Sequence, residues 1–230
     1  MRKSGKYKTS CMINIINDIF SFISNNKKGL VLSVILVFFA LICNAQNWDI
    51  DLLKEINLHR NHSLDPLFKI ITDTAPTIAY SVPVFLCLLS IIQKNKRSET
   101  KSIYLICASI LALVIEKSLK HIVNRPRPFI TYPFIEKITS ATSPSFPSGH
   151  TSDAFTLAIS LSLAYPKWYI ILPSLSWAMA VGYSRMDLGV HYPTDIIGSI
   201  VIAALSSLLC FIFLRRKEKK TLLTGDFNIE

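Results

Sequence analysis

The sequence is poor in glycine and cysteine, and each scarcity excludes a kind of site. Its seven glycines are scattered over 230 residues, so no glycine-rich loop is available to bind phosphate through backbone N–H groups. Four of the five cysteines lie inside apolar stretches, without the spacing of metal ligands or of a redox pair. A phosphate site in this chain would therefore have to use cationic side chains.

Hydrophobic residues make up 50% of the chain, and they are gathered into blocks instead of being spread periodically. The blocks approach the ~20 residues that a helix needs to cross a bilayer. The sequence therefore predicts an all-α, polytopic membrane protein with a six-transmembrane-helix bundle. The six blocks are Gly29 to Ala45, Pro76 to Gln93, Ser102 to Leu119, His150 to Tyr165, Trp168 to Tyr183 and Asp195 to Leu214.

The first block has a second interpretation as a cleavable signal peptide. Its basic leader, apolar run and small-residue ending Cys43-Asn44-Ala45 fit such a segment, and its removal would leave five transmembrane helices. We expect three regions: a basic cytoplasmic leader (1-28), a membrane-embedded domain (29-214) and a basic cytoplasmic tail (215-230).

The basic residues alternate with the apolar blocks, so the formal net charge of +10 does not form one patch for nucleic acid. Of the 25 Lys and Arg residues, 16 fall on one side of the blocks and eight on the other. The positive-inside rule places the richer side, with both termini, in the cytoplasm. We expect the loops Gln46 to Ala75, Lys120 to Gly149 and Ser184 to Thr194 to face outward, toward the periplasm if the membrane is a bacterial inner membrane.

A first candidate cluster follows the third block, where Lys120 and Arg127 stand seven residues apart. If the helix continues this far, the spacing places both side chains on one face, and Pro128 ends the helix soon afterwards. Cations at a helix end also extend commonly to lipid headgroups, and taken alone the pair favours that interpretation.

Three neighbours of this cluster each have two interpretations or a possible partner. Glu116 lies four residues before Lys120 and could pair with it along the helix. Arg125 and His121 flank the motif and could contact a second phosphate, although solvated interface residues are the favoured interpretation.

A second cluster, Pro147-Ser148-Gly149-His150, precedes the fourth block. Proline and glycine permit a tight turn, and the N–H groups at the following helix start attract an anion. The alternative is an ordinary serine-rich loop with a capping serine and an incidental histidine.

A third cluster places His191 four residues before Asp195, between the fifth and sixth blocks. On a helix with Pro193 in its first turn, that spacing makes the two side chains neighbours. A carboxylate bonded to one ring nitrogen fixes the imidazole tautomer and raises the basicity of the other nitrogen. The alternative is that Asp195 caps the last helix and His191 lies at the interface.

Together the three clusters resemble the three-part signature of the type 2 phosphatidic acid phosphatase superfamily. Every signature position is filled, and the resemblance extends from about Asn47 to Leu214. The family also includes bacterial acid phosphatases and vanadium-dependent haloperoxidases, so the signature specifies a phosphate or vanadate pocket more firmly than a substrate. Its membrane branch has six transmembrane helices and an outward-facing site.

The resemblance implies a role for each signature residue. His191 would be the nucleophile that forms a phosphohistidine, and Asp195 would hold it in the reactive orientation. His150 would protonate the leaving group and then activate water. Phosphate would be bound by Lys120, Arg127, Ser148, Gly149 and Arg185.

We expect no metal and no cofactor, because three nearby cations oppose a divalent ion and already neutralise a phosphoryl group. The expected partner is a phospholipid or isoprenoid phosphate substrate, first of all undecaprenyl diphosphate. Lipid A, phosphatidylglycerophosphate and phosphatidic acid are the alternatives. A non-catalytic anionic-lipid transporter is a remote one, since it leaves His191 with Asp195 unexplained. The sequence predicts no oligomeric state.

Overall fold

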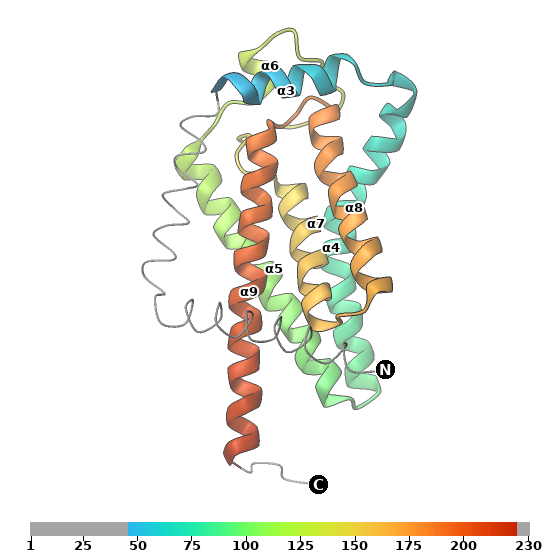
Figure 1. The fold of residues 1–230 in the computed structure, drawn as a ribbon, viewed down its shortest axis with the longest axis vertical. Coiled ribbons are helices and arrows are strands. Elements are labelled where there is room, and N and C mark those ends of the chain that lie inside the picture. Colours follow the sequence, from blue (N-terminus) through green and yellow to red (C-terminus); the bar gives the residue numbers. More distant parts are fainter. Residues whose placement is uncertain (1–45, 225–230) are drawn as a thin grey trace, which may run out of the picture. The chain divides into compact units, whose positions relative to one another are not determined.

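A computed structural model describes residues 46–224 of the chain, with side chains from 48 to 215. Every regular element in that range is helical, in the order α3, η1, α4, α5, α6, α7, α8, α9 (Figure 1). Their bounds are Gln46–Leu58, His62–Leu64, Asp65–Ile92, Lys96–Val123, Pro128–Thr131, Gly149–Ala164, Trp168–Asp187 and Pro193–Thr224. The leader and the first predicted block, Gly29 to Ala45, lie outside the described residues.

The other five predicted blocks each correspond to one long helix, namely α4, α5, α7, α8 and α9, although the blocks ending at Gln93 and Tyr165 extend one residue beyond α4 and α7. Three segments among the described residues are long and apolar enough to cross a membrane: His62–Ile92, Lys96–Thr131 and Pro193–Arg215. The all-α prediction is thus confirmed for the described residues, whereas the count of six spanning helices stays a prediction.

Helix α4 begins earlier than predicted, at Asp65 instead of Pro76. Pro66 occupies the first turn, where its missing N–H costs nothing, and the helix continues through Pro76 and Pro83. The segment Gln46 to Ala75, predicted as a loop, is therefore largely helical. The prediction placed the helix start too late because the charged residues of this segment interrupt the apolar pattern.

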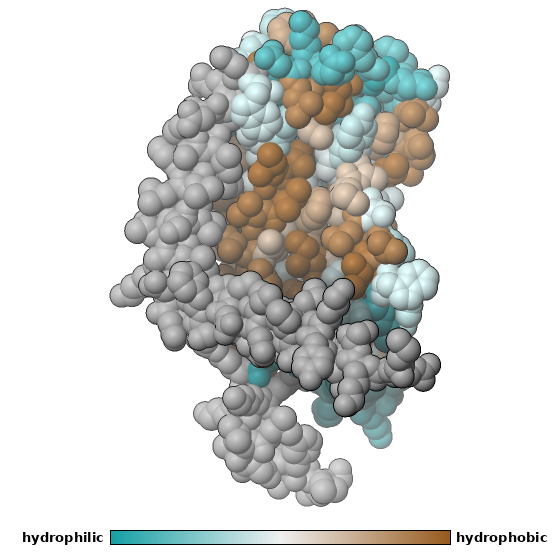
Figure 2. Space-filling view, in the orientation of Figure 1, coloured by the Kyte–Doolittle hydropathy of each residue, from teal (hydrophilic) through white to brown (hydrophobic). Residues whose placement is uncertain are grey.

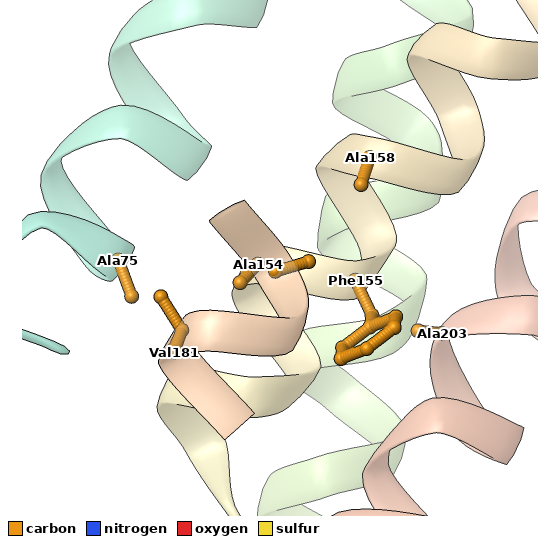
Figure 3. Close-up of a cluster of buried hydrophobic side chains, with 7 residues drawn as sticks. Ala75, Ala154, Phe155, Ala158, Val181 and Ala203 are labelled. Atoms are coloured by element: carbon orange, nitrogen blue, oxygen red, sulfur yellow. The ribbon is translucent and has the colours of Figure 1, made fainter. Parts of the chain in front are cut away.

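Small side chains bring the long helices close together. Ala75 of α4 faces Val181 of α8, and Phe155 of α7 lies beside Ala203 of α9 in one buried cluster (Figure 3). Such residues let helix backbones approach closely, as is usual where helices associate in a membrane. Between α7 and α9, the hydroxyl groups of Ser160 and Ser207 are 2.9 Å apart, which satisfies two buried polar groups.

The outer surface of the bundle is strongly apolar. Hydrophobic residues cover the middle of the face in Figure 2, and hydrophilic ones gather at the end that carries α3. Ile92 and Phe213 are 78% and 74% exposed. An apolar surface of this kind suits contact with lipid, because water would not stabilise it.

Helix α3 lies across the end of the bundle (Figure 1), where Leu53 packs with Ile135 and Tyr192. The amide of Asn57 bonds Glu136 of one loop and the carbonyl of Asp187 at the end of α8. Gly189, with φ +71°, fits because an added Cβ would lie 2.1 Å from the Glu136 carbonyl oxygen. These contacts hold the two loops that carry the candidate site beneath α3.

Candidate active site

A cavity of about 390 Å³ opens at this end of the bundle, bordered by α4, α5, α7 and α8. Six of the eight sequence-predicted site residues line it: Lys120, Arg127, Gly149, His150, Arg185 and His191. Ser148 and Asp195 are fully buried next to these residues, outside the lining. The three sequence clusters therefore meet in one place.

His191 has a geometry that fixes its tautomer. Its Nε2 lies 3.2 Å from Nη1 of Arg127, and its Nδ1 lies 3.4 Å from Oδ2 of Asp195. A guanidinium group only donates hydrogen bonds, so Nε2 accepts and the ring proton sits on Nδ1, facing the carboxylate. Burial, together with the positive charge of Arg127, lowers the pKa of His191 below its usual value. The resting imidazole is therefore neutral, with its Nε2 lone pair directed at a cation of the cavity.

Asp195 forms hydrogen bonds with several groups besides His191. Its Oδ2 accepts hydrogen bonds from the Ser145 hydroxyl and, at 2.9 Å, from the backbone N–H of Tyr192. Its Oδ1 accepts a 2.8 Å bond from Arg125. Asp195 therefore caps the start of α9 and faces His191 at the same time, so the two sequence interpretations of this residue do not exclude each other.

Lys120 and Arg127 do not share a helix face, so the conditional expectation of a helix through both was wrong. Helix α5 ends at Val123, and Asn124 adopts a left-handed conformation with φ 42°, which redirects the chain. Arg127 then precedes the short α6. A turn, not helical periodicity, brings both cations to the cavity.

Backbone carbonyl groups hold these two cations in place. Nζ of Lys120 donates to the carbonyls of Pro144 and Pro147 at 3.1 and 2.7 Å. Arg127 donates through Nε to Ser143 and through Nη1 to Val190, at 2.7 and 2.8 Å. The acceptors of Arg127 are neutral, so they orient its positive charge without cancelling it, and that charge stays available to an anion. The charge of Lys120 is partly offset by the Glu116 carboxylate, whose Oε1 lies 3.8 Å from Nζ.

Arg185 is the third cation, near the end of α8, and it is 3% exposed. Its Nη1 donates to the Thr72 hydroxyl of α4 at 2.9 Å, whereas its Nε has no hydrogen-bond partner. A buried N–H without an acceptor is costly, and an oxygen of a bound anion would satisfy it.

The turn before α7 contains a cis peptide bond between Phe146 and Pro147, and Ser148 precedes the helix. The Ser148 hydroxyl is 2.9 Å from that of Thr151, outside the cavity lining, so its role as a phosphate ligand stays a prediction. Gly149 is packed so closely against Glu116 that an added Cβ would lie 3.0 Å from Oε1 of that carboxylate.

Glu116 and Asp153 form an acidic border of the cavity, and sequence reasoning missed Asp153. Glu116 is buried, with Oε1 3.8 Å from Nζ of Lys120, which agrees with the pair suggested by their spacing. Asp153 accepts a 2.7 Å hydrogen bond from the Tyr80 hydroxyl. The position of Asp153, three residues after His150, was a usable signal, since both side chains share a helix face.

Arg125 was expected to be solvated, and this was wrong. It is paired with Asp49 at 2.6 Å and with Asp195 at 2.8 Å. His121, by contrast, is exposed as expected. Among residues 48–215, no three or more His, Cys, Asp or Glu side chains are grouped as metal ligands would be.

Comparison with known proteins gives concordant results. The model of the PAP2 superfamily matches residues 101–219. The chain is 35% identical over 156 residues to undecaprenyl-diphosphatase BcrC of Bacillus subtilis. The matched region covers 67% of this chain and 77% of that relative. It is 30% identical over 183 residues to the undecaprenyl-diphosphatase of Sulfolobus acidocaldarius, and the matched region covers 78% of this chain and 86% of that relative.

The fold is similar to the crystal structure of a transmembrane PAP2-type phosphatidylglycerolphosphate phosphatase from Bacillus subtilis. The TM-score is 0.67 at 24% identity, over 82% of this chain and 95% of that one. At this level of identity the likeness concerns the fold alone.

Proposed function

Because the chain belongs to the PAP2 superfamily and is a phosphatase, we propose that it hydrolyses undecaprenyl diphosphate through a phosphohistidine at His191. The observation that supports this best is the neutral His191, whose Nε2 lies 3.2 Å from Arg127 in a cavity that Lys120 and Arg185 also line. The choice of lipid rests on the two undecaprenyl-diphosphatases to which the chain is similar.

The first chemical step transfers the terminal phosphoryl group to His191. Lys120, Arg127 and Arg185 bind the phosphoryl oxygens, and Arg127 exchanges its contact with Nε2 for one of these oxygens. Nε2 then forms a bond to phosphorus while the bond to the lipid phosphate oxygen breaks. His150 donates a proton to that leaving oxygen, and Asp195 stabilises the Nδ1–H of the charged ring.

The second step reverses these roles. His150, now neutral, takes a proton from water as the water oxygen attacks phosphorus. The bond between phosphorus and Nε2 breaks, which releases inorganic phosphate and regenerates neutral His191. The three cations neutralise the charge that develops on the oxygens in both steps.

We further propose that the cavity opens at the periplasmic face of a bacterial inner membrane, with the C-terminus in the cytoplasm. The cavity lies where α5 and α8 end and α7 and α9 begin, and all four ends belong to the less basic side of the chain. An outward-facing site suits recycling of an isoprenoid carrier that is released outside the cytoplasm.

Phosphate release from a panel of lipids tests the proposed substrate. Purified protein in detergent should act fastest on undecaprenyl diphosphate, compared with lipid A, phosphatidylglycerophosphate and phosphatidic acid. Faster release from one of the other three would overturn the choice of lipid while leaving the phosphatase in place. Lipid binding without any release would favour the transporter.

The same assay in excess EDTA tests the absence of a metal requirement. Activity should be unchanged, because the side chains of the cavity supply the positive charge that a divalent ion supplies elsewhere. Loss of activity on chelation, restored by adding back Mg²⁺ or Zn²⁺, would contradict the proposed mechanism.

The pH dependence follows from the state of His191. Since burial lowers its pKa, the nucleophile stays neutral as the pH falls from 7 toward 5, and the acid limb of the rate profile lies below the usual histidine range. The rate should fall toward alkaline pH, because His150 must be protonated to donate. Burial and the positive charges of Arg185, Arg127 and Lys120 lower the pKa of His150 in the free cavity, so the negative charge of a bound phosphoryl group has to raise this pKa before His150 can act as the acid. A profile that is flat between pH 5 and 9 would be inconsistent with a histidine acid.

A further inference from the structure

Arg125 connects three parts of the chain that are distant in sequence. It lies between α5 and α6, and its Nη2 donates to Oδ2 of Asp49 on α3 at 2.6 Å. Its Nη1 donates to Oδ1 of Asp195 at 2.8 Å and to the Thr194 hydroxyl at 2.7 Å, both at the start of α9. The guanidinium also lies 3.8 Å from the ring centre of Tyr192, the residue next to His191.

These contacts separate Arg125 from the cations that bind phosphate. It does not line the cavity, and both of its terminal nitrogens already donate to side-chain oxygens of the protein. Any effect of Arg125 on the reaction must therefore pass through the residues that it contacts.

Asp49 and Asp195 are a pair of buried carboxylates that share this arginine. They are 1% and 0% exposed. Asp49 also accepts the backbone N–H and the hydroxyl of Thr194, at 2.9 and 2.6 Å. Two buried negative charges held this close to one cation would repel each other without it, because little water is present to screen them.

The other charged groups around Asp195 cannot replace Arg125. His191 is neutral at rest. The positive charges of Lys120 and Arg127 attract Asp195 from the cavity side. Those two cations are the ones that a phosphoryl group would bind. Arg125 alone among the described cations has a direct ion pair with this carboxylate.

We propose that Arg125 is a positioning residue for the phosphoryl transfer: by pairing with Asp49 and Asp195 together, it fixes the Asp195 carboxylate against Nδ1 of His191 and makes α3 part of the catalytic apparatus. This inference rests on the proposed function of His191. It assigns to Asp49, 145 residues from Thr194 in the sequence, a role in keeping α9 in register with the site.

The test compares Arg125→Gln with the double variant Arg125→Gln/Asp49→Asn. The single variant should lower kcat on the order of 10- to 100-fold, as losses of a partner that orients an active residue commonly do. KM and inhibition by orthovanadate should stay within about twofold, because the cavity is untouched. The double variant should regain about tenfold in kcat, since it removes the uncompensated charge of Asp49 along with the cation.

Arg60→Gln is the matched control. Arg60 is also a buried arginine with two carboxylate partners, Asp65 at 3.1 Å and Glu136 at 2.6 Å, but it has no ion pair with Asp195. Its loss should lower thermal stability while kcat per folded molecule is retained. All rates are measured on the monodisperse fraction from size exclusion, so that unfolded protein does not enter them.

Three outcomes overturn the inference: an Arg125→Gln enzyme with unchanged kcat, one whose loss lies in KM or in vanadate affinity, and a double variant that is slower than the single one. A wild-type protein that releases no phosphate from any lipid would instead overturn the proposed function. The two failures are therefore distinguishable.

Discussion

Replacement of His191 by alanine is expected to lower the rate of phosphate release by at least about 10⁴-fold, the scale seen when a nucleophile is removed from a preorganised site. In the proposed mechanism the imidazole forms the covalent bond to phosphorus, and its Nε2 lies 3.2 Å from the cation that would hold the phosphoryl oxygen. Hydroxide from solution cannot substitute efficiently, because it is neither oriented nor concentrated at the cavity.

A trapped intermediate gives the sharper measurement. Wild-type enzyme quenched during turnover of a ³²P-labelled substrate should carry a phosphoryl group that is labile in acid and stable in base, as expected of phosphohistidine. The His191→Ala protein should carry none, yet it should still bind orthovanadate, because the three cations remain.

His59→Ala is the matched control, since the side chain of His59 is 69% exposed and lies outside the cavity. It should be labelled and turn over like the wild type. Labelling that persists in His191→Ala would assign the nucleophile to another residue.

Replacement of Asp195 by asparagine is the second large effect, with an expected loss of about 10³- to 10⁴-fold in kcat. Either orientation of the amide is poorly accommodated. Its NH₂ would oppose the donor of Arg125 if placed at Oδ1, or the N–H of Tyr192 if placed at Oδ2. The His191 ring also loses the negative charge that fixes its proton on Nδ1.

Asp195→Asn should therefore differ from His191→Ala in stability as well as in rate. A buried donor facing another donor costs about 1–3 kcal/mol, so a lowered thermal midpoint is expected for this variant. The contacts of Asp195 with Ser145, Tyr192 and Arg125 are the ones that this substitution weakens. An Asp195→Asn enzyme with wild-type kcat would show that orientation of His191 does not depend on this carboxylate.

Local spacing explains which parts of this site the sequence could predict. His191 and Asp195 are one helical turn apart at a helix start, so periodicity alone made them neighbours. Glu116 and Lys120 lie within one helix and were paired for the same reason. The apolar blocks of α5 and α9 were long enough to identify the helices before any fold was known.

Contacts over long sequence distances could not be predicted in this way. Asp49 meets Thr194 across 145 positions, and Arg125 meets Asp195 across 70. No pattern within one segment marks such partners, so Arg125 was taken for a solvated residue. The turn at Asn124 was overlooked, although asparagine is, after glycine, a residue that commonly adopts the left-handed conformation at a helix end.

The two arginines of the cavity are held by neutral oxygens, and within residues 48–215 neither forms an ion pair with a carboxylate. Their attraction for a headgroup is therefore also an attraction for the orthophosphate that hydrolysis leaves behind. Product and substrate compete for the same donors, so turnover would slow in phosphate-rich surroundings. Such an enzyme would work fastest where the compartment that its cavity faces is poor in phosphate.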